Sequence, residues 1–143
     1  MIFFENFLVS FSKMDKVFLR RCHEAVSDYG LTKNEVMCLL FLQNNAPYDS
    51  PKDIAEFRRI SKSLVAKSVD SLVSAGYLTT KKEENDRRVL HLHTTPACEP
   101  ILAKLAKSRD EFRNALLEGV SPEEQAQLDI IRKKMSNNLG RMI

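Results

Sequence analysis

Apolar side chains recur at steps of three and four residues along the N-terminal part of the chain, a spacing that predicts helices. The first such stripe consists of Phe4, Leu8, Phe11, Phe18 and Cys22. Together with the stop that Gly30 supplies, it predicts one long helix from about Phe3 to Tyr29. Further apolar residues surround the start of this helix, namely Ile2, Phe3 and Phe7. One core-facing stripe does not require them all, so we expect burial on two sides, in a large core or against a second chain.

Two further helix starts are marked by capping residues. Thr32 and Glu35 have the spacing of a capping box, which predicts a second helix from Leu31 or Thr32 to about Asn44. Its apolar face consists of Val36, Leu39, Leu40 and Phe41. Ser50 followed by Pro51 predicts the start of a short third helix, which ends before Ser61. This helix carries Ile54, Ala55 and Phe57.

The segment from Ile60 to Gly76 predicts a fourth helix with two unlike faces. Its apolar stripe consists of Val65, Val69, Leu72 and Val73, and its outer stripe consists of Ser61, Lys62, Ser63, Lys67 and Ser68. Ser61 can cap the N-terminus, and Gly76 can end the helix in a left-handed conformation. After Ser61 no acidic residue occurs until Asp70. An outer face of short donors and cations suits a polyanion, and an ordinary amphipathic helix with a polar outside is the alternative.

After Gly76 the apolar period changes from that of a helix to that of a strand. Strand formers fill residues 77–82 and 89–93, and the polar segment 83–88 separates them. Leu90 and Leu92 fall on one face of the second strand, so this face can pack on the helices. A hairpin that directly follows two short helices and a tight turn is the outline of a winged helix.

Two more helices are predicted in the C-terminal third. Thr95-Pro96 restarts a helix that reaches the break at Gly119, with the apolar residues Ile101, Leu102, Leu105, Phe112 and Leu116. Ser121-Pro122 begins a final helix, with the apolar residues Leu128, Ile131, Met135, Leu139 and Met142. We expect this last stripe to pair with the apolar N-terminus in the same chain, in a partner, or in both. The predicted fold class is mainly α with a small β-hairpin wing: a winged helix-turn-helix lobe plus a helical region that carries these two apolar stripes.

Composition narrows the classes of function. The 143 residues suffice for about one domain, and the net charge of +3 is modest, so a nucleic-acid footprint must come from local clusters of cations. No apolar run reaches the roughly 18 residues that span a bilayer, and no signal peptide is evident, so we expect a cytoplasmic protein without membrane contact. The chain lacks a Gly-rich phosphate loop and a nucleophile motif, so we expect neither an enzyme nor a cofactor.

Cysteine, histidine and carboxylate residues provide weaker candidates. Cys22, Cys38 and Cys98 lie far apart and lack metal-ligand spacing, so we expect neither a disulfide nor a metal site. His91 and His93 share one face of a strand but have no third ligand, and we interpret them as polar surface residues. The pair Glu83-Glu84 at the hairpin tip is interpreted as solvated.

Several short motifs, taken in order, resemble the MarR family of transcriptional regulators. They are Gly30-Leu31-Thr32, Asp53-Ile54-Ala55-Glu56, Ile60-Ser61-Lys62-Ser63, Val69-Asp70-Ser71-Leu72, Gly76-Tyr77-Leu78, and Asp86-Arg87-Arg88 leading to Thr95. The resemblance implies a homodimer whose first, fifth and sixth helices interlock, with two winged helices on a pseudo-palindromic site in double-stranded DNA. It also implies a single domain, 1–143, in which residues 1–30 and 96–143 form the dimerisation helices and residues 31–95 form the DNA-binding lobe.

The resemblance carries over individual residues. The positions that meet the major groove are matched by Ser61, Lys62, Ser63 and Lys67, to which we add Ser68 on the same stripe. Asp86 and Arg88 match the family's Asp-x-Arg wing element. An arginine on a loop tip suits the narrow, negative minor groove, and a nearby carboxylate can hold its guanidinium in place. Further candidates for phosphate contacts are Arg87, Lys81 and Lys82.

Two positions depart from the family pattern. Arg58-Arg59 replaces the usual Leu-Gly pair of the tight turn, so we expect Phe57 to take over the packing of that leucine. The two arginines either touch phosphate or are solvated. Cys98 replaces a frequent glycine at the start of the fifth helix.

The leading hypothesis is a homodimeric DNA-binding repressor that a small ligand releases from its operator or retains on it. The apolar residues Phe11, Phe18, Val36 and Phe41 either line a ligand pocket or belong to a packed core. One alternative is a winged helix that binds a protein partner without binding DNA. The other is a thiol-based redox-sensing regulator, for which Cys98 is the best candidate.

Overall fold

The computed structural model describes residues 2–143, with side chains from residue 6 onward. The predicted apolar cluster at Ile2, Phe3 and Phe4 therefore lies outside the described side chains. The chain forms two compact units, one up to Phe112 and the other from Arg113 onward.

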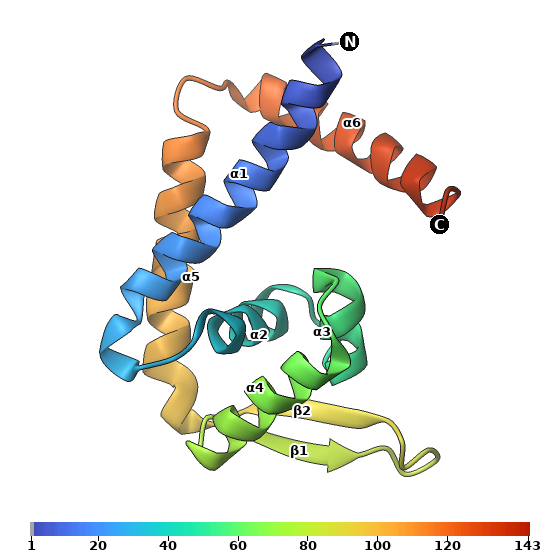
Figure 1. The fold of residues 1–143 in the computed structure, drawn as a ribbon. Coiled ribbons are helices and arrows are strands. Elements are labelled where there is room, and N and C mark those ends of the chain that lie inside the picture. The colour runs from blue at the N-terminus through green and yellow to red at the C-terminus, as the bar shows by residue number, and fades with distance from the viewer. Residues whose placement is uncertain (1) are drawn as a thin grey trace. The chain divides into compact units, whose positions relative to one another are not determined.

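The elements follow one another in the predicted order (Figure 1). The first unit contains α1 (Ile2–Ala25), α2 (Lys33–Asn44), α3 (Pro51–Arg58), α4 (Lys62–Ser74), β1 (Leu78–Lys82), β2 (Leu90–Thr94) and most of α5 (Glu99–Leu116). The second unit contains the end of α5 and α6 (Pro122–Gly140). The prediction of a mainly helical fold with a small antiparallel hairpin is confirmed.

Side chains fix the starts of three helices through reciprocal caps. Thr32 Oγ1 accepts a hydrogen bond from the Glu35 N–H at 3.1 Å, and the Glu35 carboxylate accepts one from the Thr32 N–H at 3.0 Å. The same arrangement starts two further helices, with Ser50 and Asp53 in α3 and with Ser121 and Glu124 in α6. Each capping box satisfies two backbone N–H groups that would otherwise lack partners.

The first helix is shorter than predicted. α1 ends at Ala25 rather than Tyr29, because the chain tightens into a 3₁₀ turn over Ser27–Tyr29. The N–H of Tyr29 donates to the Val26 carbonyl, three residues back, at 3.0 Å. Gly30 then reverses the chain with a φ of 66°, a conformation that glycine adopts without a Cβ clash.

The fifth helix also starts later than its proline. A 3₁₀ turn covers Pro96–Cys98, and α5 begins at Glu99. Pro96 has no N–H to donate, and the Cys98 N–H bonds to the Thr95 carbonyl at 3.0 Å, so the first turn is closed by a three-residue step. The two strands lie within one residue of the predicted boundaries.

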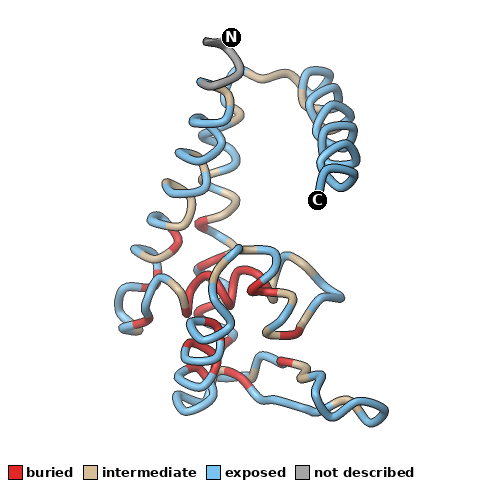
Figure 2. The backbone as a smooth tube through the Cα atoms, turned by 45° about the vertical axis from the view of Figure 1, so that its right-hand side comes forward, coloured by how far each residue is buried: buried red, intermediate tan, exposed pale blue. Residues whose placement is uncertain are grey.

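The core of the first unit is centred on α2, whose Val36 and Leu39 have no exposed surface. α2 packs against α1 and against α4. From α4, the buried residues Val65, Val69 and Leu72 enter this core. Figure 2 shows the buried positions concentrated in this part of the chain. α4 is therefore held by its inner face, and its outer face remains in solvent.

An apolar face and a backbone hydrogen bond help to attach the hairpin to the helices. Leu92 is buried and Leu90 is partly buried against the core, so the two leucines share the inner face as predicted. The Leu92 N–H donates to the Asp49 carbonyl at 2.9 Å. This bond ties β2 to the loop between α2 and α3.

Two helices leave apolar side chains exposed. In the second unit, α6 buries none of its residues, and its exposed apolar side chains include Leu128, Ile130, Ile131, Met135 and Leu139. In the first unit, α1 exposes Leu8, Val9 and Phe11. These helices carry the stripes that the sequence predicts to pair. None of the described helices is long and apolar enough to cross a bilayer.

Two leucines of α4 provide a matched test of this packing. Leu72→Ala is expected to lower the free energy of unfolding by roughly 2–5 kcal/mol, because it opens a cavity in the core. Leu64→Ala removes the same atoms from a side chain that is 45% exposed, and its effect is expected to stay within about 0.5 kcal/mol. Urea denaturation at one fixed protein concentration measures both. Equal losses in the two variants would contradict the assignment of the α4 faces.

Candidate nucleic-acid interface

The outer face of α4 presents short donors and cations to solvent. Ser61, Lys62, Ser63 and Lys67 are all exposed. Ser61 is the N-cap, and its Oγ accepts a hydrogen bond from the Leu64 N–H at 3.2 Å. No acidic residue lies in the first turn. The positive end of the helix dipole and the neighbouring ammonium groups therefore act on the same solvent region.

Ser68 does not belong to this outer face, and its predicted place there is wrong. It is only 6% exposed, and its hydroxyl donates to the Leu64 carbonyl at 2.9 Å. Its position follows from helical geometry, because it lies three residues after Val65 and four before Leu72 on the buried stripe. Val73, predicted as part of that stripe, is instead exposed.

Leu64 is an apolar residue on the exposed side of α4 that the sequence analysis overlooked. It is 45% exposed and lies between the cap at Ser61 and the cation at Lys67. Its exposure could have been predicted from helical geometry, because Leu64 lies one residue before the buried Val65 and therefore points away from the centre of the core.

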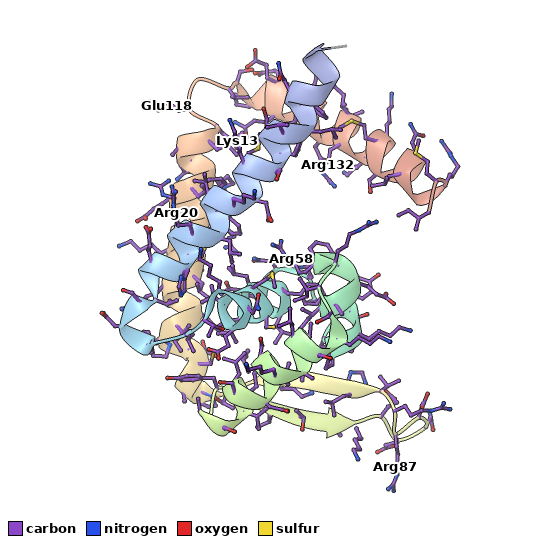
Figure 3. All side chains as sticks on the ribbon, viewed as in Figure 1. Lys13, Arg20, Arg58, Arg87, Glu118 and Arg132 are labelled. Carbon is purple, nitrogen blue, oxygen red and sulfur yellow. The ribbon has the colours of Figure 1, made fainter. Side chains whose placement is uncertain are left out.

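The hairpin loop carries a second group of cations. Lys81 and Lys82 are exposed on β1, and Asp86, Arg87 and Arg88 are exposed in the loop. Arg87 points away from the strands at the end of the hairpin (Figure 3). The Arg88 N–H donates to Asp86 Oδ1 at 3.0 Å, and Arg88 Nε lies 3.5 Å from the same oxygen. Asp86 therefore restrains the Arg88 backbone and Nε, while the side chain as a whole is 95% exposed and most of the guanidinium lies in solvent.

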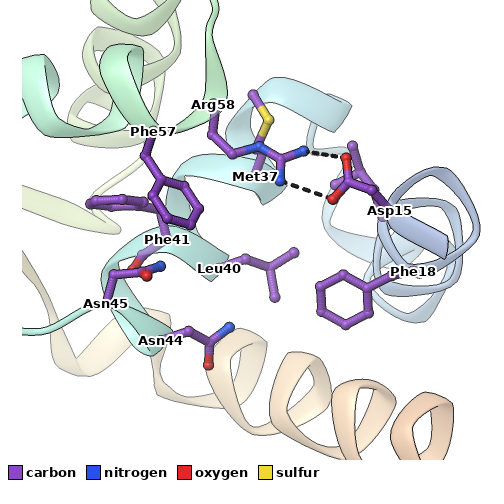
Figure 4. Close-up of a pocket in the computed structure, with 10 residues that line it drawn as sticks. Asp15, Phe18, Met37, Leu40, Phe41, Asn44, Asn45, Phe57 and Arg58 are labelled. Carbon is purple, nitrogen blue, oxygen red and sulfur yellow. Dashed lines mark hydrogen bonds and ion pairs between the residues drawn. The ribbon is translucent and has the colours of Figure 1, made fainter. Parts of the chain in front are cut away.

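Arg58 is engaged inside the protein, which corrects the expectation of a phosphate contact or a solvated side chain. Its Nη1 donates to Asp15 Oδ1 at 3.0 Å and its Nη2 donates to Asp15 Oδ2 at 2.9 Å, a bidentate pair between α3 and α1 (Figure 4). Arg59 adopts a left-handed φ of 52° as the C-cap of α3. It therefore keeps the backbone conformation that a glycine favours at this turn.

A cavity of about 120 Å³ lies beside this ion pair. Its lining includes Asp15, Phe18, Leu40, Phe41, Phe57 and Arg58 (Figure 4). Of the four residues considered as a pocket lining, Phe18 and Phe41 line this cavity, whereas Val36 is buried in the core and Phe11 is exposed. The packing role expected of Phe57 is largely wrong. Its surface is 62% exposed, and its ring meets Phe41 edge-on at a centroid distance of 5.4 Å.

His91 lies between two carboxylates, so its interpretation as a plain surface residue is wrong. Its Nδ1 is 2.7 Å from Asp49 Oδ1, and its Nε2 contacts Glu83 Oε2. The hydrogen bond to Glu83, and to a smaller extent the one to Asp49, raises the pKa of His91 above its usual value. Glu83 is thus not simply solvated. Asp49 lies 42 residues from His91 in the sequence, and no local spacing could have indicated the contact.

The three thiols are buried, which weakens the redox alternative. Burial raises the pKa of Cys38 to about 12 and the pKa of Cys98 to about 11. Burial also raises the pKa of Cys22. At physiological pH these groups are neutral thiols, and the thiolate is the form that oxidants attack. Cys98, the best candidate by sequence, has no exposed surface.

Sequence comparison relates the chain to one group of regulators. The model of the MarR family matches residues 29–89. The HTH-type transcriptional regulator Hpr of Bacillus licheniformis is 30% identical over 98 residues, which cover 68% of this chain and 46% of Hpr. The transcriptional repressor MprA of Escherichia coli K12 is 22% identical over 130 residues, which cover 90% of this chain and 74% of MprA. The chain thus spans less than half the length of Hpr.

Solved structures share the fold. A MarR transcriptional regulator from Methanosarcina mazei Go1 matches with a TM-score of 0.78 at 17% identity, covering 97% of this chain and 99% of that one. BpsR of Bordetella bronchiseptica, whose DNA binding is regulated by 6-hydroxynicotinic acid, matches with a TM-score of 0.65 at 17% identity, covering 92% and 98%. At these identities the likeness concerns the fold alone.

The burial of the thiols predicts slow alkylation. At pH 8 the native protein is expected to react with iodoacetamide roughly a hundredfold more slowly than the same chain in urea, because raised pKa values suppress the thiolate. Mass spectrometry of the digested protein measures each cysteine separately, and the unfolded chain serves as the control. A cysteine that reacts equally fast in both states would restore the redox alternative.

Proposed function

The chain belongs to the MarR family of transcriptional regulators, and from this premise we propose that it binds double-stranded DNA through the outer face of α4 and the hairpin loop. The observation that carries the proposal is the charge pattern of α4. Its exposed first turns contain Lys62 and Lys67 and no carboxylate, while Val65 and Leu72 anchor the opposite face. A helix of about this size fits the major groove of DNA.

The exposed side chains of α4 each have a suitable contact on DNA. Lys62 and Lys67 can donate to phosphate oxygens or to guanine edges, and Ser63 can donate to either. The cap at Ser61 leaves other N–H groups of the first turn directed at solvent, where a phosphate fits. Leu64 can contact the methyl group of a thymine. Ser68 is left out of the proposed interface because it is buried.

The hairpin loop is proposed to enter the minor groove. Arg87 and Arg88 are exposed, and a guanidinium is attracted to the narrow, negative minor groove. The contact between Asp86 and Arg88 limits the conformations that the arginine must give up on binding. Lys81 and Lys82 are the last residues of β1, directly before the loop, and are proposed to contact the flanking phosphates.

We further propose a homodimer in which residues 1–30 and 96–143 form the interface. The exposed apolar side chains of α6 and of α1 support it, because such faces on a small protein mark a surface for association. Two copies related by a two-fold axis would present two α4 helices to a pseudo-palindromic operator. Half-sites one helical turn apart require a separation of about 34 to 36 Å.

A small effector and a repressor role complete the proposal. MprA is named a repressor, and the DNA binding of BpsR responds to a small aromatic acid. In this chain the cavity beside Arg58 and Asp15 touches both α1 and α3. Arg58 Nε is buried there without a hydrogen-bond partner among the described residues, so it offers a donor. A ligand there could change DNA binding only by favouring one dimer shape over another.

Arg88→Ala tests the loop assignment. We expect about tenfold weaker binding to a DNA duplex selected by the wild-type protein from a random library, because a minor-groove contact is lost. Fluorescence anisotropy at fixed salt measures the affinity, and sedimentation equilibrium should show an unchanged dimer. Lys33→Ala, which removes an equal charge from an exposed site at the start of α2 and outside both proposed interfaces, is the control. Equal affinities of Arg88→Ala and the wild type would refute the loop contact, and a monomer at micromolar concentration would refute the dimer.

Salt dependence separates DNA binding from the rival, a winged helix that binds a protein. The exposed rings of Tyr48 and Phe57 beside a hollow are the observation that favours the rival. For DNA, log K should fall steeply with log[salt], and Lys67→Ala should reduce the slope by about 1, the loss of one phosphate contact. A slope near zero for the wild type would favour the protein partner.

A further inference from the structure

We propose that His91 is a positioning residue: held between Asp49 and Glu83, it fixes the hairpin loop where Arg87 and Arg88 can contact DNA, and its loss of a proton weakens DNA binding. This inference rests on the proposed function. It assigns a role to a cluster that the DNA-contacting residues do not include.

The cluster joins three segments of the chain at one ring. Asp49 belongs to the loop before α3, Glu83 follows β1 at the base of the hairpin loop, and His91 lies in β2. His91 Nδ1 lies 2.7 Å from Asp49 Oδ1, and its Nε2 contacts Glu83. The ring therefore links the body of the protein to both sides of the hairpin.

Only the protonated ring, the imidazolium, can donate a hydrogen bond to both carboxylates. A neutral imidazole has one N–H and one lone pair, whereas an ionised carboxylate only accepts hydrogen bonds. When His91 loses its proton, one carboxylate faces a lone pair, and that contact turns from attractive to repulsive. The backbone bond from Leu92 to Asp49 holds β2 to the loop in either state, so the contact with Glu83 is the freer of the two.

Other charged and polar groups lie around the ring. Lys81 is the cross-strand partner of His91. The hollow beside the ring is also lined by Lys82, Glu84, Asn85 and His93. The hydrogen bonds to Glu83 and Asp49 are the largest influences, and they raise the pKa of His91.

The sign of the pH dependence follows. We call the two contacts of His91, with Asp49 and with Glu83, the clamp. Because the pKa of His91 is higher in the folded protein than in the unfolded chain, the clamp is complete below the unfolded value of about 6.5. The clamp is lost as the pH rises through the folded value. DNA affinity is therefore expected to fall as the pH rises through the raised pKa of His91.

The first experiment observes the clamp without DNA. The ring nitrogen signals of His91 are followed by NMR against pH in the full-length protein, and His91→Gln assigns them. We expect a titration midpoint above 6.5 that moves down in Glu83→Gln. A midpoint at or below 6.5 that Glu83→Gln leaves unchanged would overturn the clamp.

The second experiment measures binding to a selected duplex from pH 6 to pH 9 at constant ionic strength. The wild type should lose about tenfold in affinity across this range, since charge-assisted hydrogen bonds are lost. His91→Gln should bind weakly at every pH. His91→Arg keeps a cation with several donors and should bind tightly at every pH, a rescue that packing alone would not give. His93→Gln changes an exposed histidine on the same face and should keep the wild-type profile.

The outcomes separate the two levels of the hypothesis. A flat wild-type profile, or the same pH dependence in His91→Gln, would overturn the role of His91 while DNA binding itself stands. If no protein binds duplex DNA at any pH, the proposed function fails, and the NMR titration still decides whether the clamp exists.

Discussion

The burial of one stripe of α4 against α2 is the interaction on which the proposed DNA-binding surface depends. The buried stripe of α4 belongs to the same core cluster as Leu39 of α2 and consists of Val65, Val69 and Leu72. The lysines of α4 lie on the opposite side of the helix and are exposed to solvent. The apolar contact fixes the rotation of the helix about its own axis, because a shift of one residue would turn it by about 100°. The chemistry of the outer face therefore relies on the packing of the inner one.

Two polar contacts extend this control beyond the core. Arg58 joins α3 to Asp15 of α1, and His91 joins the hairpin to Asp49. Partly exposed ion pairs of this kind contribute little to stability. Their importance lies in geometry, since each joins segments more than 40 residues apart in the sequence.

The sequence predicted what depends on local spacing. Helix caps such as Thr32 and Ser61, the hairpin, and the exposed lysines of α4 follow from short-range chemistry. The prediction for Ser68 is wrong because a serine in a helix need not face solvent: its hydroxyl donates to the Leu64 carbonyl of the same helix. The contacts of Arg58 and His91 could not be predicted, because nothing local indicates which distant carboxylate a cation will meet.

The backbone bond between Leu92 and Asp49 has a further consequence for solubility. A two-stranded sheet has two open edges, and an open edge invites pairing with a strand of another molecule. On β2 the loop before α3 occupies part of that edge. On β1 the exposed Lys81 and Lys82 place like charges where an incoming copy would have to dock. The hairpin can therefore project into solvent without acting as a template for aggregation.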